Sequence, residues 1–271
     1  MSAPSLLLLI PAYNEEARIE PVLRGYADFF GQHYPGRFQL VVVLNGCRDN
    51  TLGVVQRVAK DFACVTWLDF PAPIGKGGAL IEGLKLAHHG DLIGYVDADG
   101  ATGPKAFLEL LPHLQEADCV IGSRWLPGAV LHQAQPLFRR FTSRCFHLVV
   151  ESLFWMGIKD TQCPAKVIRR EAAEKIRHDL LIADLAFDVN FIVATKRAGF
   201  SVLEVPTQWT DKAGSKVTAS LFRSSLTMFL SVVRLRLIYS PFHGMLKGLR
   251  PVEAWVYGKL RAPHRHSSES R

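Results

Sequence analysis

One stretch of the sequence, Leu92–Thr102, reads LIGYVDADGAT and joins an apolar run to a pair of carboxylates. The run Leu92–Val96 has no polar alternation, which is typical of a strand buried on both faces of a parallel sheet. Asp97 and Asp99 follow where this strand should end, and Gly100 supplies a turn. Because ligands of parallel α/β sheets bind at the carboxyl ends of strands, the stretch predicts both a buried sheet and a site beside it.

Similar apolar runs occur on either side of this stretch and alternate with amphipathic segments. The expected strands are Leu6–Ile10, Leu40–Leu44, Val65–Leu68, Leu92–Val96 and Cys119–Ile121. The expected helices, with apolar residues three to four positions apart, are Glu15–Phe30, Thr51–Phe62, Gly77–His88 and Pro104–Glu116. Pro11 is expected to end the first strand. This alternation predicts an α/β fold with a mostly parallel, doubly wound, Rossmann-like sheet and helices on both faces.

The second half of the chain has a different pattern. After Gly122 the sequence predicts two longer apolar helices, Leu137–Gly157 and Leu221–Tyr239, separated by a short mixed insert, Lys159–Pro206. We expect this half to build the side of the site that receives the second substrate.

The composition limits the kind of protein. The 271 residues are 48% hydrophobic and 21% charged, which excludes a disordered or collagen-like chain. The five cysteines form no C-x-x-C pair, so neither a disulfide framework nor a zinc site is indicated. We find no apolar run of the roughly 18 residues that a membrane span needs. The run Leu6–Ile10 lacks the basic flank of a signal peptide, so we do not expect a secreted chain.

Positive charge is concentrated toward the C-terminus. Residues 212–271 contain 11 Lys and Arg against 2 Glu, a net charge of +9, so the rest of the chain carries −2 of the overall +7. A nearly neutral body with a basic, apolar end favours an anionic membrane surface over nucleic acid as a partner. We expect a peripheral or monotopic protein on the cytoplasmic face of a membrane.

The apolar part of this basic region favours a location at the membrane interface. Arg223, Arg234 and Arg236 are interleaved with aliphatic residues, as in interfacial helices whose arginines extend toward lipid headgroups. Ordinary core helices are the alternative. We therefore expect amphipathic, membrane-associating helices over residues 221–250 and a basic, disordered tail over 251–271.

Several short motifs together resemble one enzyme family. They are Pro11–Glu15, Gly75-Lys76-Gly77, Asp97–Thr102, Gly122-Ser123-Arg124, Asp160-Thr161-Gln162-Cys163, Ala186–Val189 and Trp209–Lys216. Their combination resembles the family 2 inverting glycosyltransferases of GT-A fold, above all the dolichyl-phosphate β-glucosyltransferases and next the dolichyl-phosphate mannose synthases. The resemblance implies a GT-A domain over residues 1–220, with a nucleotide-sugar half (1–124) and an acceptor half (125–220). It also implies transfer of glucose, or of mannose, to a polyprenyl or dolichyl phosphate with inversion.

The resemblance places a donor site at the strand ends. It implies that Asp97 contacts the nucleotide sugar and that Asp99 holds Mg²⁺ or Mn²⁺ on the diphosphate. Such an ion neutralises the charge that builds on the leaving nucleoside diphosphate. Lys76 and the backbone N–H groups beside it at a helix start can meet a phosphate, although an ordinary glycine-rich turn is the alternative. The candidate donor residues are Pro11, Ala12, Tyr13, Glu15, Asn45, Asp49, Lys76, Asp97 and Ala98.

Two motifs depart from the family. Where these transferases have Asp-Asp-Gly-Ser after the second strand, this chain has Leu44-Asn45-Gly46-Cys47. A leucine side chain cannot accept a hydrogen bond from the base, so base recognition is expected to pass to Asn45, to backbone groups or to Asp49. UDP-glucose is the favoured donor, and GDP-mannose is the alternative. Pro164-Ala165 also replaces the usual Gly-Phe, and this change is expected to reshape the floor of the site.

The resemblance also implies a phosphate site for the acceptor. Its candidate residues are Arg124, Arg139, Ser143 and Gln162. An arginine fork suits a phosphate better than a lysine does, whereas a solvated basic helix is the alternative explanation for these arginines. Asp160 and Asp188 join Asp97 and Asp99 as candidate catalytic residues, and Asp184 is expected to share a helix face with Asp188. A phosphate acceptor is already an anion, which lessens the need for a base.

Two other functions are compatible with the sequence. One is a glycosyltransferase with a soluble or glycolipid acceptor. The other is a catalytically silent module that binds membranes or nucleic acid, in which Leu44-Asn45 would mark a decayed donor site. The presence of both Asp97 and Asp99 argues against the silent module.

Overall fold

The computed structural model describes residues 3–132, 137–210 and 221–240. By internal contacts the chain forms two compact units, residues 1–215 and 216–271. The first unit contains the predicted sheet. In the second unit the described part is helix α8 (Leu221–Ile238). The predicted tail over 251–271, residues 241–250 and the Gly214–Lys216 part of the motif near Trp209 lie outside the described residues.

The described residues of the first unit form a seven-stranded sheet and a separate two-stranded one. In spatial order the large sheet contains β3 (Val65–Phe70), β2 (Phe38–Asn45), β1 (Leu6–Ala12), β4 (Leu92–Tyr95), β7 (Lys166–Arg169), β5 (Cys119–Ser123) and β8 (Val202–Pro206). Neighbouring strands are parallel except β7, which runs antiparallel to β4 and β5. The small sheet pairs β6 (Val130–Leu131) with β9 (Gln208–Trp209). The prediction of a mostly parallel sheet is confirmed.

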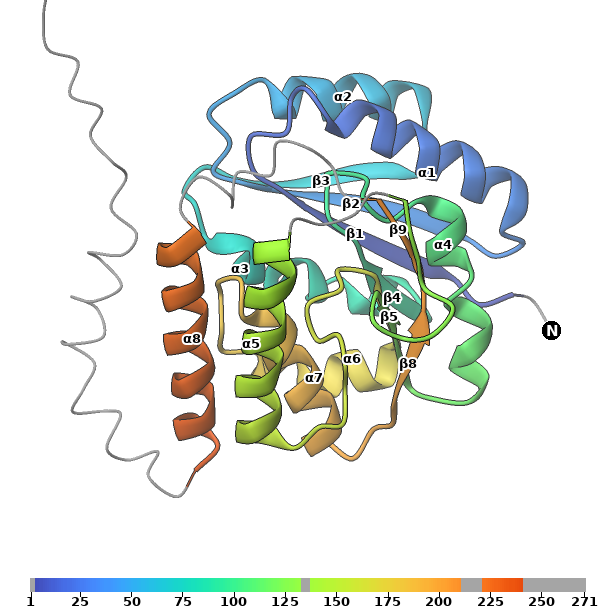
Figure 1. Ribbon diagram of the computed structural model, residues 1–271. Coiled ribbons are helices and arrows are strands. Elements are labelled where there is room, and N and C mark those ends of the chain that lie inside the picture. Colours follow the sequence, from blue (N-terminus) through green and yellow to red (C-terminus); the bar gives the residue numbers. More distant parts are fainter. Residues whose placement is uncertain (1–2, 133–136, 211–220, 241–271) are drawn as a thin grey trace, which may run out of the picture. The chain divides into compact units, whose positions relative to one another are not determined.

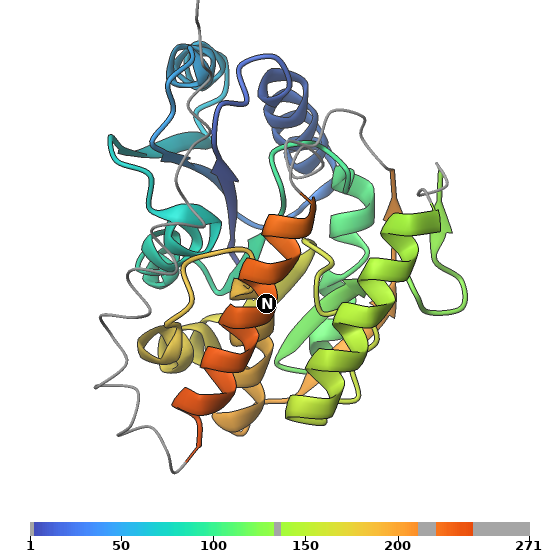
Figure 2. The same ribbon diagram turned by 60° about the vertical axis from the view of Figure 1, so that its left-hand side comes forward.

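Helices cover both faces of the large sheet (Figure 1, Figure 2). Leu6, Leu8 and Ile10 of β1 join one buried cluster with residues of three helices. These are α1 (Ile19–His33), α2 (Thr51–Asp61) and α4 (Pro104–Leu108). The opposite face carries α3 (Gly75–Leu84), α6 (Arg170–Ile176) and α7 (Phe187–Arg197). Gly83 of α3, for example, lies against Leu9 and Val43. Alternate residues of each buried strand therefore serve two different cores.

The strand β1 continues through Pro11, and the expectation that this proline ends the strand is wrong. Pro11 and Ala12 remain paired with β2. The backbone carbonyl of Leu9 accepts the N–H of Val96, so the backbone polar groups of residue 9 point toward β4. The backbone nitrogen of Pro11, two positions later in the same strand, points the same way. The pairing of β1 with β4 has ended by then, at Tyr95. The missing N–H of the proline therefore costs no ladder hydrogen bond.

Several helix boundaries differ from the prediction. α1 begins at Ile19 rather than Glu15, and no side chain caps it. Asn14, which directly precedes the predicted helix, has a positive φ of 53°. Its side-chain oxygen instead accepts the N–H of Arg48 over 2.7 Å. The predicted helix Pro104–Glu116 is divided into α4 and the 3₁₀ turn η2 (Leu111–Gln115), because the ring of Pro112 would clash with the carbonyl of the residue four positions earlier.

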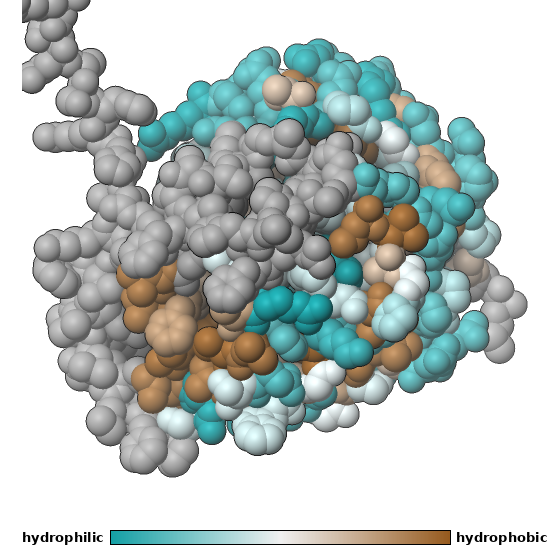
Figure 3. Space-filling view, viewed as in Figure 1, coloured by the Kyte–Doolittle hydropathy of each residue, from teal (hydrophilic) through white to brown (hydrophobic). Residues whose placement is uncertain are grey.

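The remaining segments complete the first unit. α3 is followed by the 3₁₀ turn η1 (Ala87–His89), and α6 by η3 (Arg177–Asp179). The long helix α5 (Leu137–Phe154) starts where the sequence predicts. Hydrophilic residues cover α1 and α2 on one face of the molecule, whereas apolar residues gather where α5 lies, and Leu148 on this helix is exposed (Figure 3). Among the described residues, no helix is both long and apolar enough to cross a membrane.

Candidate functional site

The two strand-end carboxylates lie in a loop that is fixed from several directions. Asp99 accepts the backbone N–H of Ala101 over 2.9 Å. The carbonyl of Ala101 accepts the N–H of Thr210, and the carbonyl of Thr102 accepts the hydroxyl of Tyr26, both over 2.9 Å. Burial, followed by the neighbouring negative charge of Asp97, raises the pKa of Asp99 above its ordinary value. A cation beside this carboxylate would therefore be stabilising.

Lys76, in the first turn of α3, extends toward these carboxylates. Its Nζ lies 2.8 Å from Oδ1 of Asp97 and 3.5 Å from Oδ2 of Asp188. The glycines around it permit close packing. Gly78 donates its N–H to the carbonyl of Ala183, and a Cβ on Gly77 would lie 2.5 Å from the carbonyl oxygen of Ile182. The Gly78 N–H thus has a partner within the protein, while the Lys76 ammonium lies at the carboxylates.

Asp188 is the centre of a buried polar cluster. Its Oδ1 accepts the hydroxyl of Tyr95 over 2.7 Å and the ammonium of Lys166 over 2.5 Å. Lys166, which is fully buried, also donates to the carbonyl of Cys163 over 2.5 Å. Burial alone would raise the pKa of Asp188, but the ammonium groups of Lys166 and Lys76 outweigh it and hold the pKa below its ordinary value. Asp188 is therefore an ionised anchor for two lysines.

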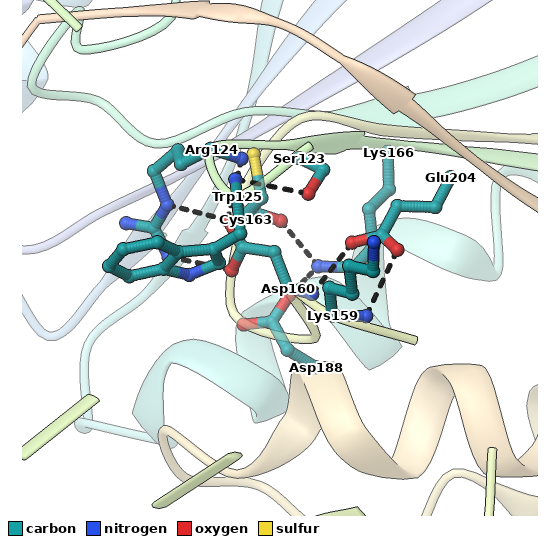
Figure 4. Close-up of polar contacts among 9 residues, drawn as sticks. All are labelled: Ser123, Arg124, Trp125, Lys159, Asp160, Cys163, Lys166, Asp188 and Glu204. Carbon is teal, nitrogen blue, oxygen red and sulfur yellow. Dashed lines mark hydrogen bonds and ion pairs between the residues drawn. The ribbon is translucent and has the colours of Figure 1, made fainter. Parts of the chain in front are cut away.

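Arg124 and Asp160 form a second buried pair (Figure 4). Nε and Nη2 of Arg124 donate to the two carboxylate oxygens over 2.7 and 2.9 Å, and the backbone N–H of Arg124 donates over 2.9 Å. The guanidinium lies over the ring of Trp209, 5.3 Å from its centroid. Burial opposes the charge of Asp160, but Arg124 outweighs it and lowers the pKa of Asp160. This arrangement fixes a cation at the end of β5.

Glu204 of β8 fixes the backbone of the segment that carries Asp160. Its carboxylate accepts the backbone N–H groups of Lys159 and Asp160 over 2.9 and 2.6 Å (Figure 4). The turn that begins at Asp160 is thus fixed by a residue 44 positions later. Sequence reasoning singled out neither Glu204 nor Lys166. A lysine within the short apolar run Ala165–Ile168 is the signal that could have drawn attention to Lys166.

The predicted base-binding residues, Asn45 at the end of β2 and Asp49 in the loop before α2, have partners within the protein. The side-chain oxygen of Asn45 accepts the N–H groups of Ile74 and Gly75 over 2.6 and 3.1 Å. Asp49 accepts the N–H groups of Thr51 and Glu16. Asn45 thus connects the end of β2 to Gly75, the residue before Lys76. Since β2, β1 and β4 are neighbours in the sheet, their ends and the start of α3 form one continuous edge.

The remaining donor candidates lie along the same edge. Pro11 and Ala12 form the last residues of β1, and Ala98 is buried between the two carboxylates. Tyr13 exposes 42% of its surface. The carboxylate of Glu15 pairs with Arg18, 2.7 Å away.

The predicted acceptor residues come from β5, from the turn before β7 and from α5. Ser143 on α5 is half-buried, and the side chain of Arg139 lies outside the described residues. Arg144, one residue after Ser143, stacks on Trp125 at 4.2 Å and so connects α5 to the Arg124 region. Nε2 of Gln162 is buried without a hydrogen-bond partner among the described residues. An unpaired buried donor beside Asp160 suits an anionic ligand.

The described residues contain no group of three or more His, Cys, Asp or Glu that could hold a metal ion. Asp99 nevertheless fits a hard divalent cation, because carboxylate oxygens are the ligands that such ions prefer. A nearby positive charge would also offset its burial and the negative charge of Asp97. A cation there would take further ligands from another molecule, such as the oxygens of a diphosphate. Asp184, expected on the helix face of Asp188, instead precedes α7 and accepts the N–H of Ala186 over 2.8 Å.

Comparison with known sequences identifies a family. Residues 8–177 match the family described as glycosyl transferase family 2. A dolichyl-phosphate β-glucosyltransferase of Dictyostelium discoideum is 32% identical over 86% of this chain and 74% of its own length. The enzyme ALG5C of Trichomonas vaginalis, with the same activity in its name, is 34% identical over 78% of this chain and 66% of its own. Glycosyltransferase AglD of Haloferax volcanii is 32% identical over 84% of this chain, which spans 36% of that longer protein.

Solved structures share the fold. Glucosyl-3-phosphoglycerate synthase of Mycobacterium tuberculosis, crystallised with Mn²⁺, UDP and glucosyl-3-phosphoglycerate, superposes with a TM-score of 0.66 at 16% identity, over 88% of this chain and 82% of that one. Mannosyl-3-phosphoglycerate synthase of Rubrobacter xylanophilus gives a TM-score of 0.63 at 16% identity, over 89% and 75%. At this identity the likeness concerns the fold alone, and it confirms the GT-A architecture. The chain belongs to glycosyl transferase family 2.

Proposed function

We propose that this chain transfers glucose, with inversion, from UDP-glucose to a dolichyl or other polyprenyl phosphate. The observation that carries the proposal is that the carboxylates Asp97 and Asp99 and the buried guanidinium of Arg124 lie at one edge of the sheet. Relatives named dolichyl-phosphate β-glucosyltransferase, at 29–34% identity, support this choice of sugar and acceptor. The alternative donor is GDP-mannose.

On the donor side, Asp99 would hold Mg²⁺ or Mn²⁺ and Asp97 would hold the sugar. The ion, when bound, would neutralise the charge that develops on the departing diphosphate. Tyr13 and Glu15 would line the nucleotide, together with Pro11 and Ala12, at the end of β1. Asn45 would orient this region by fixing the start of α3, since its side-chain oxygen already holds two backbone N–H groups there.

On the acceptor side, Arg124 would bind the lipid phosphate. Its guanidinium has five N–H donors. Among the described residues its contacts to Asp160 engage Nε and Nη2, which leaves donors that a phosphate oxygen can use. Nε2 of Gln162, buried and without a partner among the described residues, would be a second donor. Arg139 and Ser143 of α5 would complete the phosphate site.

The chemistry then needs no separate base. An oxygen of the acceptor phosphate would attack C1 of the sugar, forming the new C1–O bond as the bond to the diphosphate breaks on the opposite face. Because this phosphate is an anion near neutral pH, no proton has to be removed. Asp160 and Asp188, ionised and held by cations, would position the site rather than accept protons.

The membrane association of the chain is part of the proposal. A polyprenyl acceptor lies in a bilayer, and the basic residues between 212 and 271 suit its anionic surface. Residues 1–124 would bind the nucleotide sugar, residues 125–220 would bind the acceptor, and residues 221–250 would rest on the cytoplasmic face of the membrane.

The test is transfer from radiolabelled UDP-glucose or GDP-mannose to dolichyl phosphate in lipid vesicles, with 3-phosphoglycerate as a soluble acceptor for comparison. We expect label from UDP-glucose in the lipid fraction, with the configuration at C1 of the glucose inverted relative to the donor. EDTA and the nearly isosteric Asp99→Asn should both abolish this transfer, whereas Asp69→Asn, an exposed carboxylate on β3, should leave it unchanged. Label appearing in phosphoglycerate and not in lipid would overturn the proposed acceptor, and full activity in EDTA would remove the metal.

A further inference from the structure

Lys76 is placed between two carboxylates that have different surroundings. Asp97, at 2.8 Å, is about one-third exposed at its side chain, whereas the side chain of Asp188, at 3.5 Å, is 2% exposed. Burial would lower the pKa of Lys76, but Asp97 and Asp188 outweigh it and raise the pKa, so the side chain is an ammonium ion. The ammonium thus neutralises the carboxylate that faces the donor site.

The two oxygens of Asp188 have separate roles. Oδ1 accepts both Tyr95 and Lys166. Oδ2 faces Lys76 at 3.5 Å, which is just beyond hydrogen-bond distance. A movement of less than about 1 Å would bring the ammonium into hydrogen-bond contact with this oxygen. Lys166 and Tyr95 already fix the carboxylate of Asp188. The oxygen that would accept the Lys76 ammonium is therefore held in place before the ammonium moves.

We propose that Lys76 is the resident counter-ion of the donor carboxylates and makes binding of a divalent cation depend on the nucleotide. In the free protein its ammonium holds Asp97. When cation and nucleoside diphosphate bind together, the ammonium moves to Oδ2 of Asp188 and releases Asp97 to the donor. This inference rests on the proposed donor site and adds that the cation binds there only together with the nucleotide.

The balance of charge supports this order. Counted as ionised groups, the three carboxylates (Asp97, Asp99, Asp188) and the two ammonium groups (Lys76, Lys166) give the cluster a net charge of −1. A divalent cation alone would leave an excess positive charge in a largely buried site, where charges interact more strongly than in water. A nucleoside diphosphate brings its own negative charge and removes that excess. Without Lys76 the cluster would carry −2 and would match a lone divalent cation.

The experiment measures Mn²⁺ binding, by the electron paramagnetic resonance signal of free Mn²⁺, without and with UDP. The full chain is compared with Lys76→Met, with Lys76→Arg and with the control Lys85→Met, whose side chain is 60% exposed and pairs with Glu82. We expect Lys76→Met to tighten Mn²⁺ binding about tenfold in the absence of UDP, which corresponds to about 1.4 kcal/mol. Lys76→Arg and Lys85→Met should bind Mn²⁺ as the unmodified chain does.

Thermal unfolding verifies that each variant is folded. If Lys76→Met does not fold, Mn²⁺ binding is measured with Lys76→Gln in its place. Equal Mn²⁺ affinity of the Lys76→Met and unmodified chains without UDP would overturn the inference, as would a Lys76→Arg variant that binds like Lys76→Met. An unmodified chain that binds no Mn²⁺ even with UDP would instead contradict the proposed donor site. The two failures are therefore distinguishable.

Discussion

Arg124 and Asp160 form a buried ion pair whose partners can be removed singly or together. Arg124→Ala leaves the carboxylate of Asp160, 2% exposed at its side chain, without its cation. Removing one partner of such a pair costs about 3–5 kcal/mol of unfolding free energy, whereas removing both costs much less. We therefore expect the double variant Arg124→Ala/Asp160→Ala to be more stable in urea than Arg124→Ala alone.

Transfer to lipid separates this structural effect from function. Both variants should lose transfer to dolichyl phosphate, because both lack the guanidinium. A double variant as unstable as Arg124→Ala would mean that Asp160 is not neutralised by Arg124. A stable double variant with full transfer would place the acceptor phosphate elsewhere.

The same pair predicts how stability depends on pH. The pKa of Asp160 is lower in the folded chain than its ordinary value, because Arg124 outweighs burial. A carboxyl group with a lowered folded pKa contributes its stability above the unfolded pKa of about 3.9 and loses it as the pH falls through the folded pKa. The difference in unfolding free energy between the unmodified chain and Asp160→Asn should be constant from about pH 7 to pH 5 and shrink below about pH 4. A difference that persists at full size to pH 2 would contradict the ion pair.

At the scale of helices and strands, the sequence predicts what depends on local pattern. The buried strands are uniform apolar runs, and their predicted positions are close to the observed ones. β7 was not predicted, because it is four residues long and contains two charged ends, Lys166 and Arg169. Its antiparallel direction is set by pairing with β4 and β5, two strands distant in the sequence, which no local pattern encodes. The start of α1 was misjudged because no capping side chain marks it.

The site shows the same division between local and long-range information. Asp97, Asp99 and Arg124 could be found because they follow buried strands, where parallel sheets bind ligands. Lys166 and Glu204 could not, because Lys166 lies within a short strand, and Glu204 reaches the backbone of Asp160 across 44 positions of sequence. Pairing of this kind is decided by the order of strands in the sheet, with β8 beside β5.

Glycine substitutions test the packing of α3 and α1. A Cβ at Gly77 would lie 2.5 Å from the Ile182 carbonyl oxygen and 2.7 Å from Cβ of Phe187, whereas a Cβ at Gly25 would meet nothing within 4 Å. We expect Gly25→Ala to stabilise the chain by about 0.5–1 kcal/mol through the helix propensity of alanine. Gly77→Ala should destabilise it by about 1–3 kcal/mol through overpacking, as measured in urea. Equal effects of the two substitutions would disprove the close contact of α3 with the segment before α7.

At the scale of the whole molecule, charge is divided between the two units. Residues 212–271 carry a net charge of +9, whereas the preceding residues, which contain the described site, carry −2. The division by contacts falls nearby, between residues 215 and 216. The residues of the candidate site and the excess positive charge therefore belong to different parts of the chain.

Deleting residues from Leu221 onward should release the protein from vesicles that contain anionic lipid. Each basic residue near an anionic bilayer contributes about 1 kcal/mol, and the deleted segment also removes the apolar residues that would enter the interface. The truncated chain should still bind UDP, because the donor residues precede residue 125, but it should glycosylate lipid slowly. Binding is measured by co-sedimentation with vesicles, and folding by the thermal transition.

Salt separates the two contributions to this binding. Screening weakens the attraction between exposed charges but not the burial of apolar surface, so raising the salt concentration should release the full chain only in part. Complete release at high salt would mean that charge alone holds the chain on the membrane. A truncated chain that sediments with vesicles as fully as the intact one would contradict the assignment to residues 221–250. It would move the membrane contact to residues 145–158, where Leu148 on α5 is 66% exposed and Trp155, directly after this helix, is 84% exposed.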